Sequence, residues 1–219
     1  MSKKKPEVNA TTFIKSYWNY FLELEQQLCD IRRYVDFSRK NNNTFSMEFL
    51  KLLQAVCSEI DVVAKVIDSY IDVNFKGTRI NDWGYALQQS FPNIQSKKVT
   101  FNDDYDLQPW GNWFYVREEQ EIKQGNNKGK TRTTIKLKEK CKNPEWWTAY
   151  NKSKHERTSP YNNSNINYNR ANLKNVISAF AALFITESMF FDYIFAKENV
   201  SIEHEKSKLF VFSDKGEKD

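Results

Sequence analysis

The stretch ANLKNVISAFAALFITESMFFDYIFAK, residues 171–197, is the most apolar part of the chain and decides the fold. A helix that is hydrophobic on nearly every side lies inside a packed core or spans a membrane. Thr186, Glu187 and Asp192 interrupt this one, and a charged group at bilayer depth costs about 2.5–3.5 kcal/mol. We therefore expect a buried helix at the centre of a helical bundle, and no membrane partner.

Two segments nearer the N-terminus have the period of amphipathic helices. Apolar residues recur every three or four positions over 12–37 and again over 46–73, where the first residue, a serine, is suited to cap the helix. Three asparagines at 41–43 break the pattern between them. Because this connection is short, the two helices are expected to form an antiparallel pair. A shorter helix is expected over 81–91, capped by its first residue, Asn81.

The region 97–140 is expected to be an insertion of strands between the helices. A short strand is predicted at 97–101. Residues 112–123 and 130–138 are rich in β-branched and aromatic side chains and flank a turn-prone sequence, GNNKG. The two segments are therefore predicted to form a β-hairpin. A further short strand is expected at 206–212.

Together these elements predict a mainly α fold, an antiparallel helical bundle with a small inserted β-hairpin. Domains typically run to about 100–200 residues, so residues 1–219 are interpreted as a single helical domain. Aromatic residues make up 15% of the chain, which favours a packed globule over a disordered chain.

Cysteine and histidine usage bears on the redox compartment and on metals. The three cysteines are odd in number and far apart, which argues against a disulfide framework and a cysteine-based zinc site. The chain has only two histidines, so a His-rich metal site is not expected either. Three of the first six residues are lysines and no apolar segment follows them, so no signal peptide is predicted. We expect a cytoplasmic protein with neither a cofactor nor a metal.

A run of cations lies in the predicted hairpin. The net charge of the chain is only +5, and the excess is concentrated here. Such a run can attract the phosphates of a nucleic acid, and it can equally be the solvated face of a hairpin. The residues that would bind a nucleic acid are Lys128, Lys130, Arg132, Lys136 and Lys138.

The segment after the hairpin, residues 143–157, begins as a helix should. Asn143 is suited to the N-cap and Pro144 to the first helical position, where its missing N–H is not needed. Glu145 then places a negative charge in the first turn, where the helix dipole favours it. We therefore expect a helix that starts at Pro144.

The candidate catalytic residues lie further along this helix. Asn151 and His155 are four positions apart, so they share a helix face. Lys154 and Arg157 place positive charge beside the imidazole, which disfavours its protonated form. A neutral imidazole can accept a proton, while an amide and cations can hold a phosphate. This set suits attack of an RNA 2′-hydroxyl on the adjacent phosphodiester, which needs a base and charge stabilisation but no metal.

The sequence YNKSKH, residues 150–155, resembles the signature of the HEPN superfamily. In that signature an Arg, a small polar residue, three variable residues and a His follow one another. The wider stretch, from Trp146 through Arg157 and on to residues 171–176 and 181–184, is similar to uncharacterised bacterial proteins related to that group. HEPN domains are small helical bundles that commonly dimerise. Many are metal-independent RNases in toxin–antitoxin, CRISPR-associated and abortive-infection systems.

The resemblance implies a homodimer that acts on RNA in phage defence or as a toxin, with a protein partner encoded nearby. His155 would be the base, and Asn151 would orient it or the phosphate. Lys154 and Arg157 would stabilise charge. Tyr150 stands where the motif has Arg, and a tyrosine supplies no cationic fork. Three functions therefore stay open: a metal-independent endoribonuclease, a catalytically inactive helical interaction module, and a nucleic-acid binder that uses the basic hairpin.

The remaining aromatic and ionisable residues are expected to have structural roles. Trp110 and Trp113 are expected to pack in the interior. Trp146 and Trp147 are adjacent and point in different directions on a helix, so one is expected in the core and the other over a site or an interface. His204 lies in a charged segment and is expected at the surface.

Overall fold

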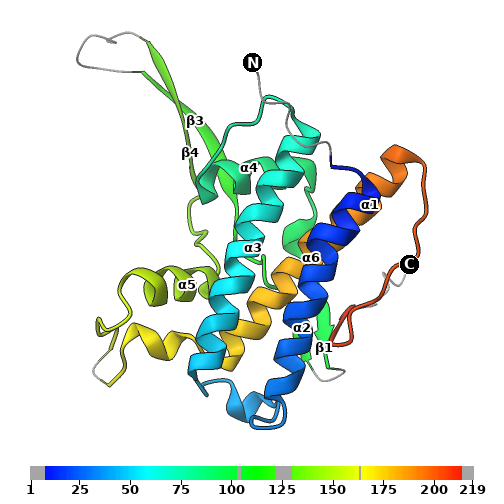
Figure 1. The fold of residues 1–219 in the computed structure, drawn as a ribbon. Coiled ribbons are helices and arrows are strands. Elements are labelled where there is room, and N and C mark those ends of the chain that lie inside the picture. Colours follow the sequence, from blue (N-terminus) through cyan, green and yellow to red (C-terminus); the bar gives the residue numbers. More distant parts are fainter. Residues whose placement is uncertain (1–7, 103–104, 122–129, 163, 214–219) are drawn as a thin grey trace, which may run out of the picture.

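The structure is a computed structural model that describes residues 8–102, 105–121, 130–162 and 164–213 (Figure 1). Over these residues the chain is mainly helical, with five helices packed together and two small antiparallel sheets. The predicted fold class, a helical bundle with a small inserted β-hairpin, is confirmed.

The central helix is α6, Leu173–Glu198, and most of its side chains are buried, as its composition predicts. Asn172 caps its start by accepting a hydrogen bond from the backbone N–H of Asn175. It ends at Asn199, whose φ of 52° is left-handed. By length and composition α6 could also cross a membrane, and 67% of the apolar window concerned is buried inside this bundle. The absence of a membrane partner therefore stays a prediction.

The N-terminal helix is continuous but changes its winding. It consists of α1 (Ala10–Phe13), a π-helical segment η1 (Ile14–Trp18) and α2 (Asn19–Ile31). The predicted end at residue 37 is wrong. The chain turns after Ile31 and thereby places the ring of Phe37 in the core, 5.5 Å from that of Phe101.

The helix α3, Met47–Ile71, runs antiparallel to α2 after a short 3₁₀ turn, η2 (Arg39–Asn41) (Figure 1). The hydroxyl of Ser46 caps it by accepting a hydrogen bond from the backbone N–H of Phe49 at 3.1 Å. The apolar stripe of α3 packs against both α2 and α6. The predicted antiparallel helix pair is therefore confirmed.

The helix α4, Ile80–Ser90, connects the bundle to the hairpin. It begins after Arg79, whose backbone N–H donates to the carboxylate of Asp82. The prediction that Asn81 caps this helix is wrong, because its side-chain amide donates instead to the backbone carbonyl of Ile135 in the hairpin. A side chain used in this long-range bond is not available to the helix end.

The hairpin consists of β3 (Tyr115–Glu121) and β4 (Thr131–Leu137), with Arg117 opposite Ile135. It projects from the bundle beside α4 (Figure 1). The predicted hairpin is confirmed. The base of the hairpin lies close to Gly84 of α4. A Cβ atom added at this glycine would lie only 2.5 Å from the ring of Trp113, so a larger residue does not fit there.

A second sheet joins the middle of the sequence to its C-terminal part, in the order β2–β1–β5. Its strands are β1 (Val99–Phe101), β2 (Tyr105–Leu107) and β5 (Phe210–Phe212). The strands predicted at 97–101 and 206–212 are confirmed in shorter form. β2 has no counterpart in the sequence prediction, because three residues are too few to show an alternating pattern.

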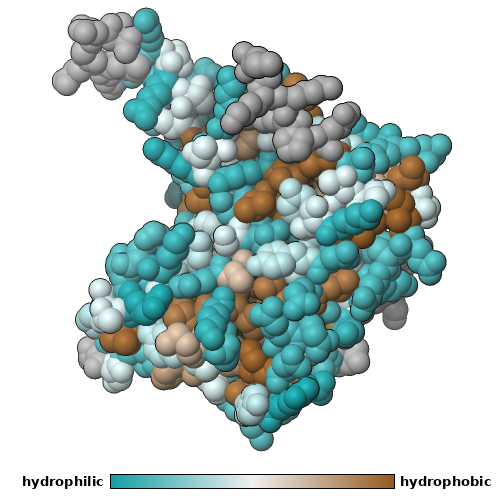
Figure 2. Space-filling view, in the orientation of Figure 1, coloured by the Kyte–Doolittle hydropathy of each residue, from teal (hydrophilic) through white to brown (hydrophobic). Residues whose placement is uncertain are grey.

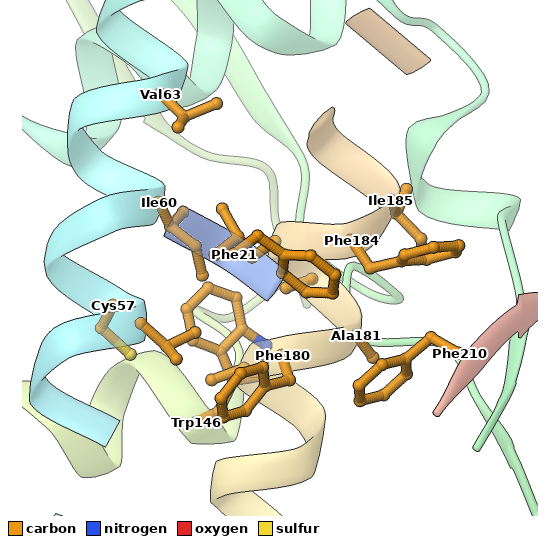
Figure 3. Packing of buried hydrophobic residues seen from close by; sticks show 14 of the residues in the cluster. Phe21, Cys57, Ile60, Val63, Trp146, Phe180, Ala181, Phe184, Ile185 and Phe210 are labelled. Atoms are coloured by element: carbon orange, nitrogen blue, oxygen red, sulfur yellow. The ribbon is translucent and has the colours of Figure 1, made fainter. Parts of the chain in front are cut away.

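Side chains from α2, α3, α5, α6 and β5 meet in one hydrophobic core (Figure 3). Full burial of a large apolar side chain contributes about 1.5–3 kcal/mol, so this cluster is the main source of stability. The side chains labelled in Figure 3 are Phe21, Cys57, Ile60, Val63, Trp146, Phe180, Ala181, Phe184, Ile185 and Phe210.

A buried carboxylate fastens the C-terminal segment to α2. Glu25 is 1% exposed and accepts hydrogen bonds from the hydroxyl of Ser207 and from the backbone N–H groups of the next two residues. This attachment draws the preceding residues onto α6, where the ring of His204 stacks on Phe191 with centroids 4.6 Å apart. The prediction that His204 lies at the surface is confirmed only in part, since the ring is half-buried.

Candidate functional site

The helix α5, Glu145–His155, carries the predicted motif. It begins one residue later than expected, so Pro144 occupies the N-cap position. The prediction that Asn143 caps it is wrong, because the Asn143 side chain accepts a hydrogen bond from the hydroxyl of Tyr115 at 2.9 Å. The charge of Glu145 is paired with Lys174 of α6, 2.7 Å away. The start of α5 is thus attached both to β3 and to the central helix.

Two tryptophans hold the inner face of α5. Trp146 is 2% exposed, and its indole N–H donates to the backbone carbonyl of Pro109 at 3.0 Å. Trp147 is 8% exposed and lies edge-on to Trp83, with centroids 5.6 Å apart. The expectation that one of the pair covers a site or an interface is therefore wrong: both pack inside. Trp110 and Trp113 are also buried, as predicted.

The loop that follows α5 is fastened by the short helix η4, Asn167–Arg170. The amide of Asn167 donates to the backbone carbonyl of Glu156, and the backbone N–H of Tyr168 donates to that of Arg157. The two residues that follow α5 are therefore bonded to η4, and this fixes the backbone at the C-terminal end of the helix.

His155 is the last residue of α5 and is exposed. Its ring has no hydrogen-bond partner among the residues that the structure describes. Asn151 lies one helical turn earlier and is half-buried, and its amide donates one N–H to the backbone carbonyl of Trp147 at 3.0 Å. The second N–H of this amide remains to serve a ligand. The surface over α5 in the view of Figure 2 is mostly hydrophilic.

Tyr150, at the place of the motif Arg, positions a cation. Its side chain is only 7% exposed, and its hydroxyl accepts a hydrogen bond from the ammonium of Lys154 at 3.0 Å. The same ammonium lies 5.1 Å from the centroid of the Tyr150 ring, within the range of a cation–π contact. The hydrogen bond to Tyr150 raises the pKa of Lys154, so this group stays charged. Tyrosine supplies no charge of its own here, but it fixes a neighbouring one.

Arg157 adds a second cation beyond the end of the helix. Its Nε donates to the backbone carbonyl of Ser153 at 3.2 Å, and its side chain is exposed. Lys152 and Glu156 form an ion pair of 2.8 Å next to it. Residues 150–157 thus carry three cations against one carboxylate, besides the imidazole. The structure places the predicted residues in the C-terminal half of α5 and just beyond it, on an open surface.

The basic residues of the hairpin are placed differently from this cluster. Lys128 lies outside the described residues, and the other four are exposed on or beside β4. Lys136 pairs with Glu118 of β3 at 2.8 Å, and the ammonium of Lys138 lies over the ring of Phe114. The strand β3 carries three glutamates next to β4. The hairpin surface is therefore of mixed charge over its described part. The residues predicted there to bind a nucleic acid are Lys128, Lys130, Arg132, Lys136 and Lys138.

No group of three or more His, Cys, Asp or Glu side chains that could hold a metal ion occurs in the described part of the chain. Comparisons of the chain with models of protein families, with curated proteins and with solved structures found no match.

Proposed function

We propose that the C-terminal end of α5 binds RNA and cleaves it without a metal, with His155 as the general base. The observation that supports this proposal most is the exposed imidazole of His155, which lies one turn from Asn151 and follows Lys154, whose ammonium Tyr150 holds in place. An imidazole buried and bonded to the main chain would have excluded this chemistry, and His155 is neither.

The proposed reaction is an internal transesterification of the phosphodiester. A nitrogen of His155 takes the proton of the ribose 2′-hydroxyl, and the 2′-oxygen attacks the adjacent phosphorus. The bond to the 5′-oxygen breaks, and that oxygen leaves with a proton from solvent. The products are a 2′,3′-cyclic phosphate and a free 5′-hydroxyl. Lys154 and Arg157 stabilise the charge that develops on the phosphate oxygens, and the amide of Asn151 orients the group.

The replacement His155→Ala is expected to lower the rate of RNA cleavage by about 10²-fold or more, because general-base catalysis typically contributes that factor. The measurement is cleavage of an end-labelled single-stranded RNA in the presence of a chelator. Lys152→Ala is the matched control, since it removes a cation of the same helix that is paired with Glu156. Wild type and His155→Ala cleaving at equal rates would remove the catalytic role.

The folding of the variant serves as an internal control. The ring of His155 is exposed and makes no hydrogen bond with the described residues, so its removal should change the free energy of unfolding by less than about 0.5 kcal/mol. A loss of cleavage at unchanged stability then reports chemistry rather than misfolding. An RNA with a 2′-deoxy substitution at the cleaved position should resist the wild-type protein.

The replacement Tyr150→Phe tests the role of the fixed cation. It keeps the buried ring and removes the hydroxyl that accepts from Lys154. A hydrogen bond of this kind is worth about 0.5–1.5 kcal/mol, so the cleavage rate is expected to fall about two- to tenfold. Lys154→Ala should have at least as large an effect. An unchanged rate in both variants would show that this cation takes no part.

The catalytically inactive interaction module is the second candidate, and the observation that favours it is Tyr150 at the place of the motif Arg. It predicts no cleavage by the wild type under any of these conditions. The homodimer, the protein partner encoded nearby, the role in phage defence and the cytoplasmic location stay predictions. Light scattering of the purified protein tests the first of them.

A further inference from the structure

The loop between α5 and η4 carries an exposed aromatic ring on a fixed backbone (Figure 1). The ring belongs to Tyr161, which is 40% exposed. Its two sides of the loop are paired, since Pro160 and Ile166 form an antiparallel bridge. The backbone N–H of Asn167 also donates to the carbonyl of Ser159 at 2.9 Å. This pairing holds Tyr161 at a defined place on the surface.

A guanidinium group covers one face of this ring. The Cζ atom of Arg170 lies 3.9 Å from the centroid of the Tyr161 ring, within the range of a cation–π contact. The Nε of Arg170 donates to the side-chain oxygen of Asn167 at 2.9 Å. The amide of Asn167 donates in turn to the backbone carbonyl of Glu156, also at 2.9 Å. Glu156 directly follows His155, so this chain of contacts connects the ring to the residue next to the proposed base.

The arginine of this pair keeps donors for a ligand. A guanidinium has five N–H donors, and Asn167 accepts from the one at Nε. The donors at the other two nitrogens have no hydrogen-bond partner among the described residues. Asn167 is 2% exposed and uses both polar atoms of its side chain, so it orients Arg170 and is not itself available to a ligand.

Closing the loop does not require the aromatic ring, because the backbone pairing closes it without Tyr161. Single exposed aromatic residues are ordinary on protein surfaces. Here a second exposed ring, that of Phe45, lies edge-on to Tyr168 of η4 with centroids 5.5 Å apart and is 43% exposed. The backbone N–H of Tyr168 donates to the carbonyl of Arg157. Both exposed rings are therefore attached to the segment that follows α5.

Exposed rings next to unpaired cations suit the bases and phosphates of an unpaired nucleic-acid strand. Unpaired bases of RNA stack on aromatic side chains and on the planes of guanidinium groups. Arg157 and Arg170 donate to neutral oxygens of the protein and form no ion pair with a described residue. Their charge is available to phosphates, whereas in a duplex the faces of the bases are already covered by one another.

We propose that the Tyr161–Arg170 pair is a binding site for one unpaired base of the RNA. The base stacks on the accessible part of the pair, and the free N–H groups of Arg170 donate to the phosphate of the same nucleotide. This inference extends the RNA site proposed on α5 and rests on that proposal. The substrate is accordingly a single strand or an unpaired loop.

The affinity for a short fluorescently labelled single-stranded RNA, measured by anisotropy, tests this site. The titration uses the His155→Ala variant, so that the RNA stays intact. Adding Tyr161→Ala is expected to weaken binding about tenfold, which corresponds to about 1.4 kcal/mol, because one base loses its stacking partner. Tyr161→Phe keeps the ring and should keep the affinity. Tyr20→Ala is the matched control, since Tyr20 on α2 is 41% exposed and lies outside this loop.

The role of the guanidinium is tested by the dependence of binding on salt. Removing one phosphate contact to a single strand lowers the slope of log affinity against log salt by about 0.7, and Arg170→Gln is expected to have this effect. A duplex of the same sequence should bind about tenfold more weakly than the single strand. Urea unfolding of each variant checks that the fold is kept.

Equal affinities of Tyr161→Ala and Tyr20→Ala would overturn the proposal, and so would a duplex that binds as tightly as the single strand. A dimer that Tyr161→Ala dissociates, at unchanged RNA affinity, would also overturn it, because the surface would then bind a second copy of the chain. The cleavage proposal fails separately. A wild type that cuts no RNA, but whose affinity for RNA depends on Tyr161, would support the base-binding site alone.

Discussion

The replacement Glu187→Gln is expected to stabilise the protein at pH 8 and to leave its stability at pH 5 nearly unchanged. Glu187 lies in the middle of α6, is 0% exposed, and neither of its carboxyl oxygens has a hydrogen-bond partner among the described residues. Burial, reinforced by the negative charge of Glu59, raises the pKa of Glu187 well above its ordinary value. A glutamine has nearly the same shape and no charge to desolvate.

The direction in which stability changes with pH follows from the number of protons that the folded and unfolded states bind. Burial raises the pKa of Asp68 to about 8 and that of Glu59 to about 7 in the folded state. In the unfolded chain such groups lose their protons near pH 4. Between about pH 4 and pH 8 the folded state therefore binds more protons, so stability is fully present below pH 4 and is lost as the pH rises. A tenfold difference in proton affinity between the folded and unfolded states corresponds to about 1.4 kcal/mol.

Urea unfolding at pH 5, 6, 7 and 8 checks this expectation. The wild type should lose stability steadily over that series, and Glu187→Gln should have a flatter profile. Glu23→Gln is the control, because Glu23 is exposed on α2 and its replacement should leave the profile of the wild type unchanged. A wild-type protein that becomes more stable from pH 5 to pH 8 would refute the buried, protonated state of these carboxyl groups.

The replacement Trp146→Ala is expected to cost about 3–5 kcal/mol of stability, the usual loss for a large aromatic side chain in a core. The indole of Trp146 is 2% exposed and lies 5.1 Å from the ring of Trp110 and 5.9 Å from that of Trp147. Its removal also leaves the backbone carbonyl of Pro109 without its donor. Typical domains have a free energy of unfolding of about 5–15 kcal/mol, so this single replacement approaches the total stability of a domain at the lower end of that range.

The matched control is Tyr34→Ala, because Tyr34 is an aromatic residue that is 86% exposed. It should change the free energy of unfolding by less than about 0.5 kcal/mol. Trp146→Phe keeps part of the ring packing and should lie between the two. If Trp146→Ala and Tyr34→Ala destabilise the protein equally in urea, Trp146 is not the core residue that α5 depends on.

Much of the fold could be predicted from local patterns. The apolar composition of residues 171–197 predicts the central helix, and the period over 46–73 predicts α3 together with its serine cap. The β-branched residues on either side of GNNKG predict the hairpin. These features depend on contacts between residues a few positions apart, on hydrogen bonds within a turn of helix and on the residues that a turn requires. Interactions between such near neighbours can be inferred from the order of the residues alone.

The candidate site on α5 was predicted in part. Four-residue spacing places Asn151 and His155 on one face in any helix, so their proximity needed no tertiary information. That His155 is exposed, and that Tyr150 fixes the ammonium of Lys154, depends on which side of α5 its buried tryptophans attach to the bundle. The amphipathic pattern of α5 is too weak to predict which face of the helix packs against the bundle.

The sequence by itself determined the helices, the hairpin and the order of the chemical groups along α5, because each of these rests on interactions between near neighbours. The tertiary structure alone decided that the carboxyl group of Asp68 is buried and that the ring of His204 is partly covered. Asp68 has no local signature that separates it from exposed acids, and the half-buried ring of His204 depends on Glu25, far away in the chain. Burial is set by segments that meet only after folding, so no pattern of adjacent residues encodes it.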